Sequence, residues 1–205
     1  MLNHKSTRSA RLFWLGALLG AAVFFLVYGL APLDIANDAF CRGGYIEKDI
    51  QQHYAGWLFY LSSAPGWPLG VTQAVNAPQG VSVAYTDSIP LLAVLCRPLA
   101  AALGGTFQYF GWFTLVCFAL QGGFAALLCG LFAEGLAAPL AGSLVFAASP
   151  ILLERAFRHT SLGAQWLVLA ALYCYFVCRR QRRFASRGLF VINILAVGIH
   201  PYFLP

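Results

Sequence analysis

Charged side chains are scarce in this sequence of 205 residues. Only 10% of its residues are Asp, Glu, Lys or Arg, whereas 60% are hydrophobic, and the mean hydropathy is +0.72. Soluble domains carry roughly 25% charged residues, because their surfaces must be hydrated. A composition this poor in charge excludes a water-soluble globular domain and indicates a protein embedded in a membrane.

Several chemical signatures are also missing. The six cysteines include no CxxC pair, which argues against a zinc–thiolate site, a redox pair or a disulfide framework. The sequence has no glycine-rich phosphate loop, no Ser-His-Asp arrangement and no nucleotide-sugar motif, so a cytosolic nucleotide-sugar enzyme is not supported. The net charge of +6 comes from Lys and Arg that flank apolar runs rather than form one basic face. Nucleic acid is therefore not an expected partner.

Long apolar runs dominate the sequence. A helix needs about 20 residues to cross the hydrocarbon layer of a membrane, which is about 30 Å thick. We predict an all-α, polytopic transmembrane helix bundle in which residues 1–205 form a single transmembrane domain. The sequence stops inside an apolar run, so we expect it to be the N-terminal part of a longer protein. The expected spans are about 12–30, 107–133, 136–153, 161–178 and 188–205.

Basic residues beside these runs predict the orientation. Lys5, Arg8 and Arg11 precede the first run, which is too long for the roughly 7–15-residue core of a cleaved signal and indicates a retained anchor. The basic stretch Arg179–Arg187 follows the fourth run. Lys and Arg concentrate in cytoplasmic segments, and four crossings return the chain to its starting side. We therefore expect a multi-pass protein of the bacterial inner (plasma) membrane with a cytoplasmic N-terminus.

A shorter apolar run lies within the first external loop, 31–106. Residues 89–103 are apolar but include Arg97 followed by Pro98. A fifth crossing here would also place the later arginine cluster outside. We interpret the run as a re-entrant or juxtamembrane helix, although its length leaves a tilted or shallow span open.

The same loop holds an amphipathic helix, predicted over 49–61. Ile50, Tyr54 and Trp57 recur with helical spacing on one face, whereas Asp49 and His53 share the opposite face. The aromatic content suits a helix at the membrane–water interface. Its polar face then either lines an external cavity or is simply solvated.

Two further polar positions are open to more than one interpretation. Asp87 or Ser88 is placed to cap the helix that follows, with Pro90 in its first turn, so capping and catalysis are both possible roles for Asp87. His200, at the predicted external end of the last run, is either structural or a further polar contribution to a site.

The second external loop carries a basic group. Arg155, Arg158 and His159 have i, i+3, i+4 spacing, which would aim them the same way from one helical turn. Guanidinium groups suit bidentate capture of phosphate. The alternative is that the arginines reach toward lipid headgroups, with a local pair between Glu154 and Arg158.

Taken together, these features resemble the GT-C superfamily of integral-membrane glycosyltransferases. More narrowly, the chain resembles an uncharacterised bacterial multi-pass family of that kind. The segments that carry the resemblance are Asp49-Ile50-Gln51-Gln52-His53-Tyr54-Ala55-Gly56-Trp57, Trp67-Pro68-Leu69-Gly70, Tyr85-Thr86-Asp87-Ser88-Ile89-Pro90-Leu91, Gln108-Tyr109-Phe110-Gly111, Leu120-Gln121-Gly122 and Arg158-His159-Thr160-Ser161-Leu162-Gly163-Ala164-Gln165-Trp166.

The resemblance implies an activity and a set of roles. The expected reaction is inverting transfer of a hexosyl or pentosyl group from a polyprenyl-phosphate-linked donor to an extracytoplasmic acceptor. Asp49 matches the acidic residue that serves as catalytic base or metal ligand. The expected substrate-binding residues are Arg155, Arg158, His159, His53 and Asp87.

The chain also departs from the GT-C pattern. The second loop lacks an Asp-x-Asp motif and has only Glu154 as an acidic residue. No cofactor is therefore certain, although a divalent metal held partly by Asp49 and Asp87 is possible. The expected partners are the lipid-linked sugar donor and membrane lipids.

Two other function classes compete with the enzyme. One is a non-catalytic membrane assembly protein, or an inactive fragment of an enzyme. The other is a transporter subunit, which the sequence favours less because no Asp, Glu or Lys lies at the centre of a predicted span.

Overall fold

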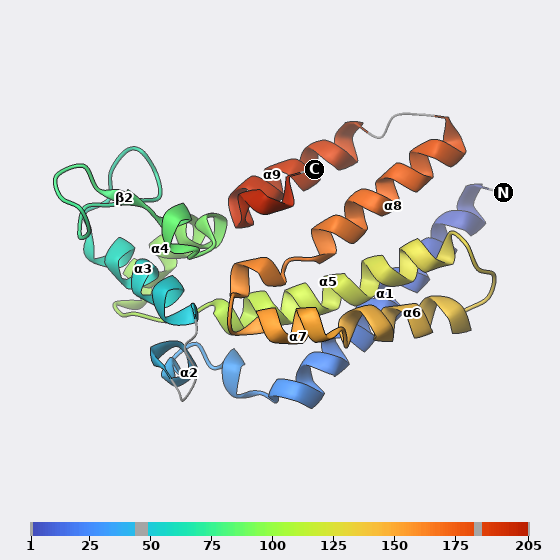
Figure 1. Cartoon of the computed structure of the whole chain (residues 1–205), viewed down its shortest axis with the longest axis horizontal. Helices are drawn as coiled ribbons and strands as arrows, with labels where there is room; N and C mark the ends of the chain where they lie inside the picture. The colour runs from blue at the N-terminus through green and yellow to red at the C-terminus, as the bar shows by residue number, and fades with distance from the viewer. Residues whose placement is uncertain (1, 44–48, 183–185, 205) are drawn as a thin grey trace.

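The fold is that of a computed structural model, which describes residues 2–43, 49–182 and 186–204 (Figure 1). It is mostly helical, with 71% helix and 2% strand, as the all-α prediction expects. The strands β1 (Val71–Thr72) and β2 (Val81–Ser82) form one antiparallel pair. The helices are α1 (Leu2–Tyr28), α2 (Ala39–Arg42), α3 (Ile50–Ser62), α4 (Pro90–Leu103), α5 (Phe110–Gly130), α6 (Ala137–Ala147), α7 (Pro150–Ala156), α8 (Trp166–Gln181) and α9 (Ser186–Ile199). The short 3-10 helices are η1 (Ala31–Leu33), η2 (Val83–Thr86), η3 (Thr160–Gly163) and η4 (Pro201–Phe203).

Three described helical segments are long and apolar enough to cross a membrane: Thr7–Tyr28, Phe110–Gly130 and Thr160–Gln181. Each has 21 or 22 residues. At a rise of about 1.5 Å per residue, such a segment is about 32 Å long, which matches the hydrocarbon layer. The chain is therefore a membrane protein, and these segments overlap the predicted spans 12–30, 107–133 and 161–178.

The predicted span 136–153 is not one straight helix. It divides into α6 and α7, which meet at an angle of 45° and together form either a broken span or a re-entrant segment. The break has a local cause. Ser149 accepts a hydrogen bond from the backbone N–H of Leu152 at 3.3 Å, and Pro150, which has no N–H to donate, begins α7.

The last predicted span, 188–205, is also shorter than expected. Its helix α9 ends at Ile199 and has 14 residues, as does α4, which the sequence predicts as a short helix over 89–103. Neither is long enough to cross a membrane alone. The two helices contact each other. A Cβ on Gly198 of α9 would lie only 3.0 Å from the Cβ of Leu91 of α4.

The basic segments gather at one end of the bundle. Arg8 donates hydrogen bonds to the carbonyls of Gly130 and Ala133 at 3.3 and 3.0 Å, beside the C-terminal end of α5. Arg180, in the last turn of α8, lies over the ring of Phe132 in the same region. Figure 1 shows the N-terminus here and α2, α3 and α4 at the other end. The Lys5 side chain and Arg183, which also belong to the predicted basic groups, lie outside the described residues.

Small residues bring the spanning helices together. A Cβ on Gly16 would lie 2.4 Å from the carbonyl oxygen of Gly122, so α1 and α5 pack backbone against backbone. The hydroxyl of Ser143 on α6 contacts the carbonyl oxygens of both glycines, at 3.1 and 3.0 Å. Such close packing is typical of helix pairs in membranes, where burial of apolar surface does not drive association.

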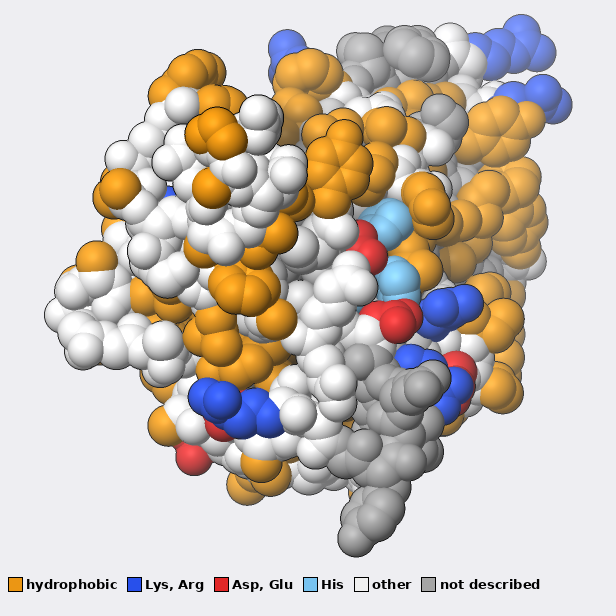
Figure 2. Space-filling view, turned by 60° about the vertical axis from the view of Figure 1, so that its left-hand side comes forward, with side chains coloured by type: hydrophobic (Ala, Val, Ile, Leu, Met, Phe, Trp, Pro, Cys, Tyr) orange, Lys and Arg blue, Asp and Glu red, His pale blue; other side chains and the backbone are white. Residues whose placement is uncertain are grey.

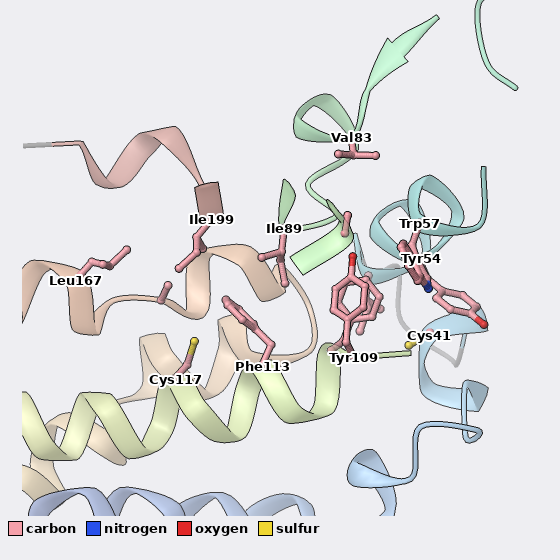
Figure 3. Close-up of a cluster of buried hydrophobic side chains, with 14 of the residues drawn as sticks. Cys41, Tyr54, Trp57, Val83, Ile89, Tyr109, Phe113, Cys117, Leu167 and Ile199 are labelled. Atoms are coloured by element: carbon pink, nitrogen blue, oxygen red, sulfur yellow. The ribbon is translucent and has the colours of Figure 1, made fainter. Parts of the chain in front are cut away.

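An aromatic cluster supports the elements at the other end (Figure 3). Trp57 of α3 is fully buried and donates a hydrogen bond from Nε1 to the carbonyl of Phe107 at 2.7 Å. Its ring also packs on that of Tyr109, at the start of α5. This contact fixes α3 on the rim of the bundle, which is the part of the structure that carries the polar site.

Candidate functional site

Three of the four histidines in the sequence converge with two aspartates at this end of the bundle. We refer to Asp49, His53, Asp87, His159 and His200 as the His–Asp cluster. His159 Nδ1 lies 2.7 Å from Asp49 Oδ2, and His159 Nε2 lies 3.6 Å from Asp87 Oδ2. His200 Nε2 lies 3.2 Å from Asp87 Oδ1, and His53 Nε2 lies 4.0 Å from Asp87 Oδ2. Figure 2 shows histidine and acidic side chains together on one face, with basic side chains beside them.

Asp49 stands directly before α3 and does not cap that helix with its side chain. Its carboxylate instead pairs with His159, which lies between α7 and η3. The Asp49 side chain is 58% exposed, whereas that of His159 is 18% exposed. The carboxylate is therefore open to solvent on one side and held by the imidazole on the other.

Asp87 does not cap α4, so the capping prediction for Asp87 and Ser88 is wrong. The residue at the start of α4 is Ile89, and it makes no side-chain cap. Asp87 ends η2 in the left-handed conformation, with φ of 53°, which few residues other than glycine adopt. That backbone turn directs the carboxylate toward the histidines. The Ser88 hydroxyl donates to the carbonyl of His53 at 2.6 Å, which ties the Asp87 segment to α3.

His53 is fully buried, so the alternative of a simply solvated polar face for α3 is wrong at this position. Neither ring nitrogen has a hydrogen-bond partner among the described residues. Burial, and then the neighbouring His159, lower the pKa of His53 from 6.5 to about 4. The ring is therefore neutral at neutral pH, with a lone pair free on one nitrogen.

The single helical turn predicted for Arg155, Arg158 and His159 is not observed, because helix α7 ends at Ala156 and only Arg155 belongs to it. Arg158 pairs with Glu154, as the alternative interpretation expects, and Arg155 is exposed. Of the three, it is His159 that joins the His–Asp cluster.

His200 follows α9 and is the member for which the sequence offered the weakest signal. Its Nδ1 accepts a hydrogen bond from the backbone N–H of Tyr202 at 3.3 Å, and its ring packs edge-on against the Tyr202 ring. A neutral His200 therefore carries its proton on Nε2, which faces Asp87.

These features define an α-helical membrane protein with a His–Asp cluster at one end of its bundle. The cluster extends from buried His53 to exposed Asp49. The chain belongs to the family described as Domain of unknown function (DUF6311), whose model matches residues 17–205. No curated protein and no solved structure matches the chain.

Proposed function

We propose that the full-length protein is an integral-membrane glycosyltransferase of the GT-C kind. It would transfer a sugar from a polyprenyl-phosphate-linked donor to an extracytoplasmic acceptor. The observation that carries the proposal is the 2.7 Å pair between Asp49 and His159, which joins two separate loops into one polar site at the rim of the bundle.

Orientation supports this proposal. The basic segments around Arg8 and Arg180 lie at the opposite end of the bundle from Asp49. Basic segments favour the cytoplasmic side, so the His–Asp cluster would face away from the cytoplasm. In a bacterial inner membrane, a lipid-linked sugar presents its head at that surface while its tail stays in the lipid.

In the proposed reaction, Asp49 acts as general base. It takes the proton of an acceptor hydroxyl, and the hydroxyl oxygen bonds to the anomeric carbon of the donor sugar. The bond between that carbon and the phosphate oxygen breaks, and its electron pair leaves with the polyprenyl phosphate. Positioned bases contribute about 10²–10⁴-fold to such steps.

The surroundings of Asp49 suit this role. Its exposed side allows an acceptor to approach, and its contact with His159 holds the carboxylate in place. Arg155 and Arg158 precede His159 on the same segment, where their charge would stabilise the phosphate as it leaves. Arg158 would then share its guanidinium between Glu154 and the donor.

The test is transfer from a radiolabelled polyprenyl-phosphate hexose or pentose, with the full-length protein in membranes of its source cell. Asp49→Asn should lower the rate at least about 100-fold. Glu134→Gln is a matched control, because Glu134 is an exposed acid beyond the C-terminal end of α5. Equal rates for Asp49→Asn and the wild type would contradict the proposal. The same would follow if the wild-type protein gave no transfer above membranes that lack it.

A further inference from the structure

We propose that His53, Asp87 and His159 bind one divalent transition-metal ion as a two-histidine, one-carboxylate site. The ligand atoms are His53 Nε2, Asp87 Oδ2 and His159 Nε2. Such a site would exist whether or not the protein transfers sugar.

The distances between these atoms suit a shared ion better than hydrogen bonds. Asp87 Oδ2 lies 3.6 Å from His159 Nε2 and 4.0 Å from His53 Nε2. Both distances exceed the upper end of an N–H···O hydrogen bond, about 3.2 Å. Ligands about 2.1 Å from a tetrahedral zinc ion are about 3.4 Å from one another. One ligand atom from each residue lies within 4.8 Å of the other two, so small side-chain movements would close the site.

His53 supplies an independent indication of a ligand. It is 0% exposed, and neither ring nitrogen has a hydrogen-bond partner among the described residues. Buried polar atoms without partners are rare in native proteins, because they lose their contacts with water and gain nothing in return. A metal ion bound at Nε2 would give this nitrogen its partner.

Two further contacts orient the ligands from outside. Asp49 pairs with His159 Nδ1 at 2.7 Å, which fixes that proton on Nδ1 and leaves the Nε2 lone pair facing Asp87. His200 Nε2 lies 3.2 Å from Asp87 Oδ1, so Asp87 Oδ2 is the oxygen left for the metal. Hydrogen bonds of this kind are the usual support of histidine and carboxylate ligands.

His200 is a positioning residue rather than a fourth ligand. Its Nδ1 accepts the Tyr202 N–H, so its Nε2 carries the proton and has no lone pair to give. The site therefore has three protein ligands and at least one open position, as in catalytic rather than structural zinc sites. Anionic oxygen, such as that of a phosphate group, is the chemical class of ligand suited to the open position.

The donor set also indicates which metal binds. Imidazole ligands suit zinc, iron, cobalt, nickel and copper, whereas magnesium and calcium prefer sites made of oxygen. We therefore expect Zn²⁺ and Co²⁺ to bind far more tightly than Mg²⁺.

The test uses the full-length protein, purified in detergent, stripped with a chelator and titrated with Co²⁺. The wild type should bind one Co²⁺ per chain, with visible d–d absorption that Zn²⁺ abolishes and Mg²⁺ does not. His159→Gln and Asp87→Asn should remove this absorption, and Asp49→Asn should weaken binding about 10–100-fold. His4→Gln is the matched control, because His4 belongs to the N-terminal part of α1 and should bind Co²⁺ like the wild type.

His159→Gln is preferred to a His53 variant because His159 is partly exposed and its replacement is less disruptive to folding. Circular dichroism and gel filtration would establish that each variant is folded. Absence of stoichiometric Co²⁺ absorption in the wild type would overturn the metal site, as would unchanged absorption in folded His159→Gln. Cobalt binding without sugar transfer would retain the metal site and reject the glycosyltransferase. Sugar transfer that survives complete metal removal, together with no cobalt binding, would reject the metal site and retain the glycosyltransferase.

Discussion

Asp49 and His159 are 110 residues apart in the sequence, yet Asp49 Oδ2 and His159 Nδ1 lie 2.7 Å apart. Between them the chain passes through all five helices from α3 to α7. The contact shows that the loop before α3 and the segment after α7 meet at one end of the bundle. Any chemistry assigned to either loop therefore belongs to a single site.

The first prediction concerns the side of the membrane that this site faces. In a variant without native cysteines, Tyr85→Cys and Arg155→Cys should react with a membrane-impermeant maleimide added to intact cells. Both positions are exposed and belong to the end of the bundle that carries the cluster. Glu134→Cys, near the opposite end, should react only after the cells are opened. Labelling of residue 134 but not of 85 or 155 in intact cells would reverse the proposed orientation.

The second prediction concerns the packing of α1 on α5. A Cβ on Gly16 would lie 2.4 Å from a backbone oxygen, which has no room to move. Gly16→Ala should therefore destabilise the protein by about 1–3 kcal/mol, the usual cost of overpacking. Thermal unfolding in detergent measures this change, and Gly66→Ala is the control because no atom lies within 4 Å of its added Cβ. Equal melting temperatures for the two variants would contradict the close packing.

The third prediction is a pH dependence of stability. The Tyr54 hydroxyl donates to Asp38 Oδ2 at 2.8 Å, and Arg42 Nε donates to the same oxygen at 2.7 Å. The Tyr54 hydrogen bond, followed by the Arg42 contacts, lowers the pKa of Asp38 below its usual value. Because the folded state then holds this proton less tightly than the unfolded state, the stabilisation is present above the unfolded pKa. It is lost as the pH falls through the folded pKa.

Asp38→Asn should therefore lower the melting temperature at pH 7 and have a smaller effect at pH 3. The Asp38 side chain is 25% exposed and its partner Arg42 is 61% exposed, so solvent screens the pair and we expect its contribution to be below about 1 kcal/mol. Asp34→Asn serves as a control, since among the described residues the Asp34 carboxylate accepts a hydrogen bond only from the nearby N–H of Ala36. The same loss of stability at both pH values would show that the ionic form of Asp38 does not matter.

The helices were largely predictable from the sequence because their signals are local. Run length located the three spanning segments, periodicity located α3 and a short apolar run located α4, both to within a residue or two. The break between α6 and α7 also has a local signal, at Ser149 and Pro150, but the apolar run conceals it.

The assembly of the site was not predictable in the same way. All five cluster residues could be chosen as candidates, because polar side chains are so few, but their contacts depend on the tertiary fold. His53 is buried because Ser88 and His159 cover the polar face of α3, whereas periodicity alone leaves that face open to a cavity or to solvent. Asp87 faces the histidines because of a left-handed backbone turn, which aspartate tolerates better than most residues but which the local sequence does not specify.

The most direct test of the account is a double-mutant cycle on sugar transfer with Asp49→Asn and His159→Gln. If the two residues act as one unit, each single variant should lose at least about 100-fold in rate. The double variant should then be no slower than the slower single variant, because linked residues are not additive. Losses that multiply, or an Asp49→Asn protein that transfers sugar at the wild-type rate, would contradict the central claim.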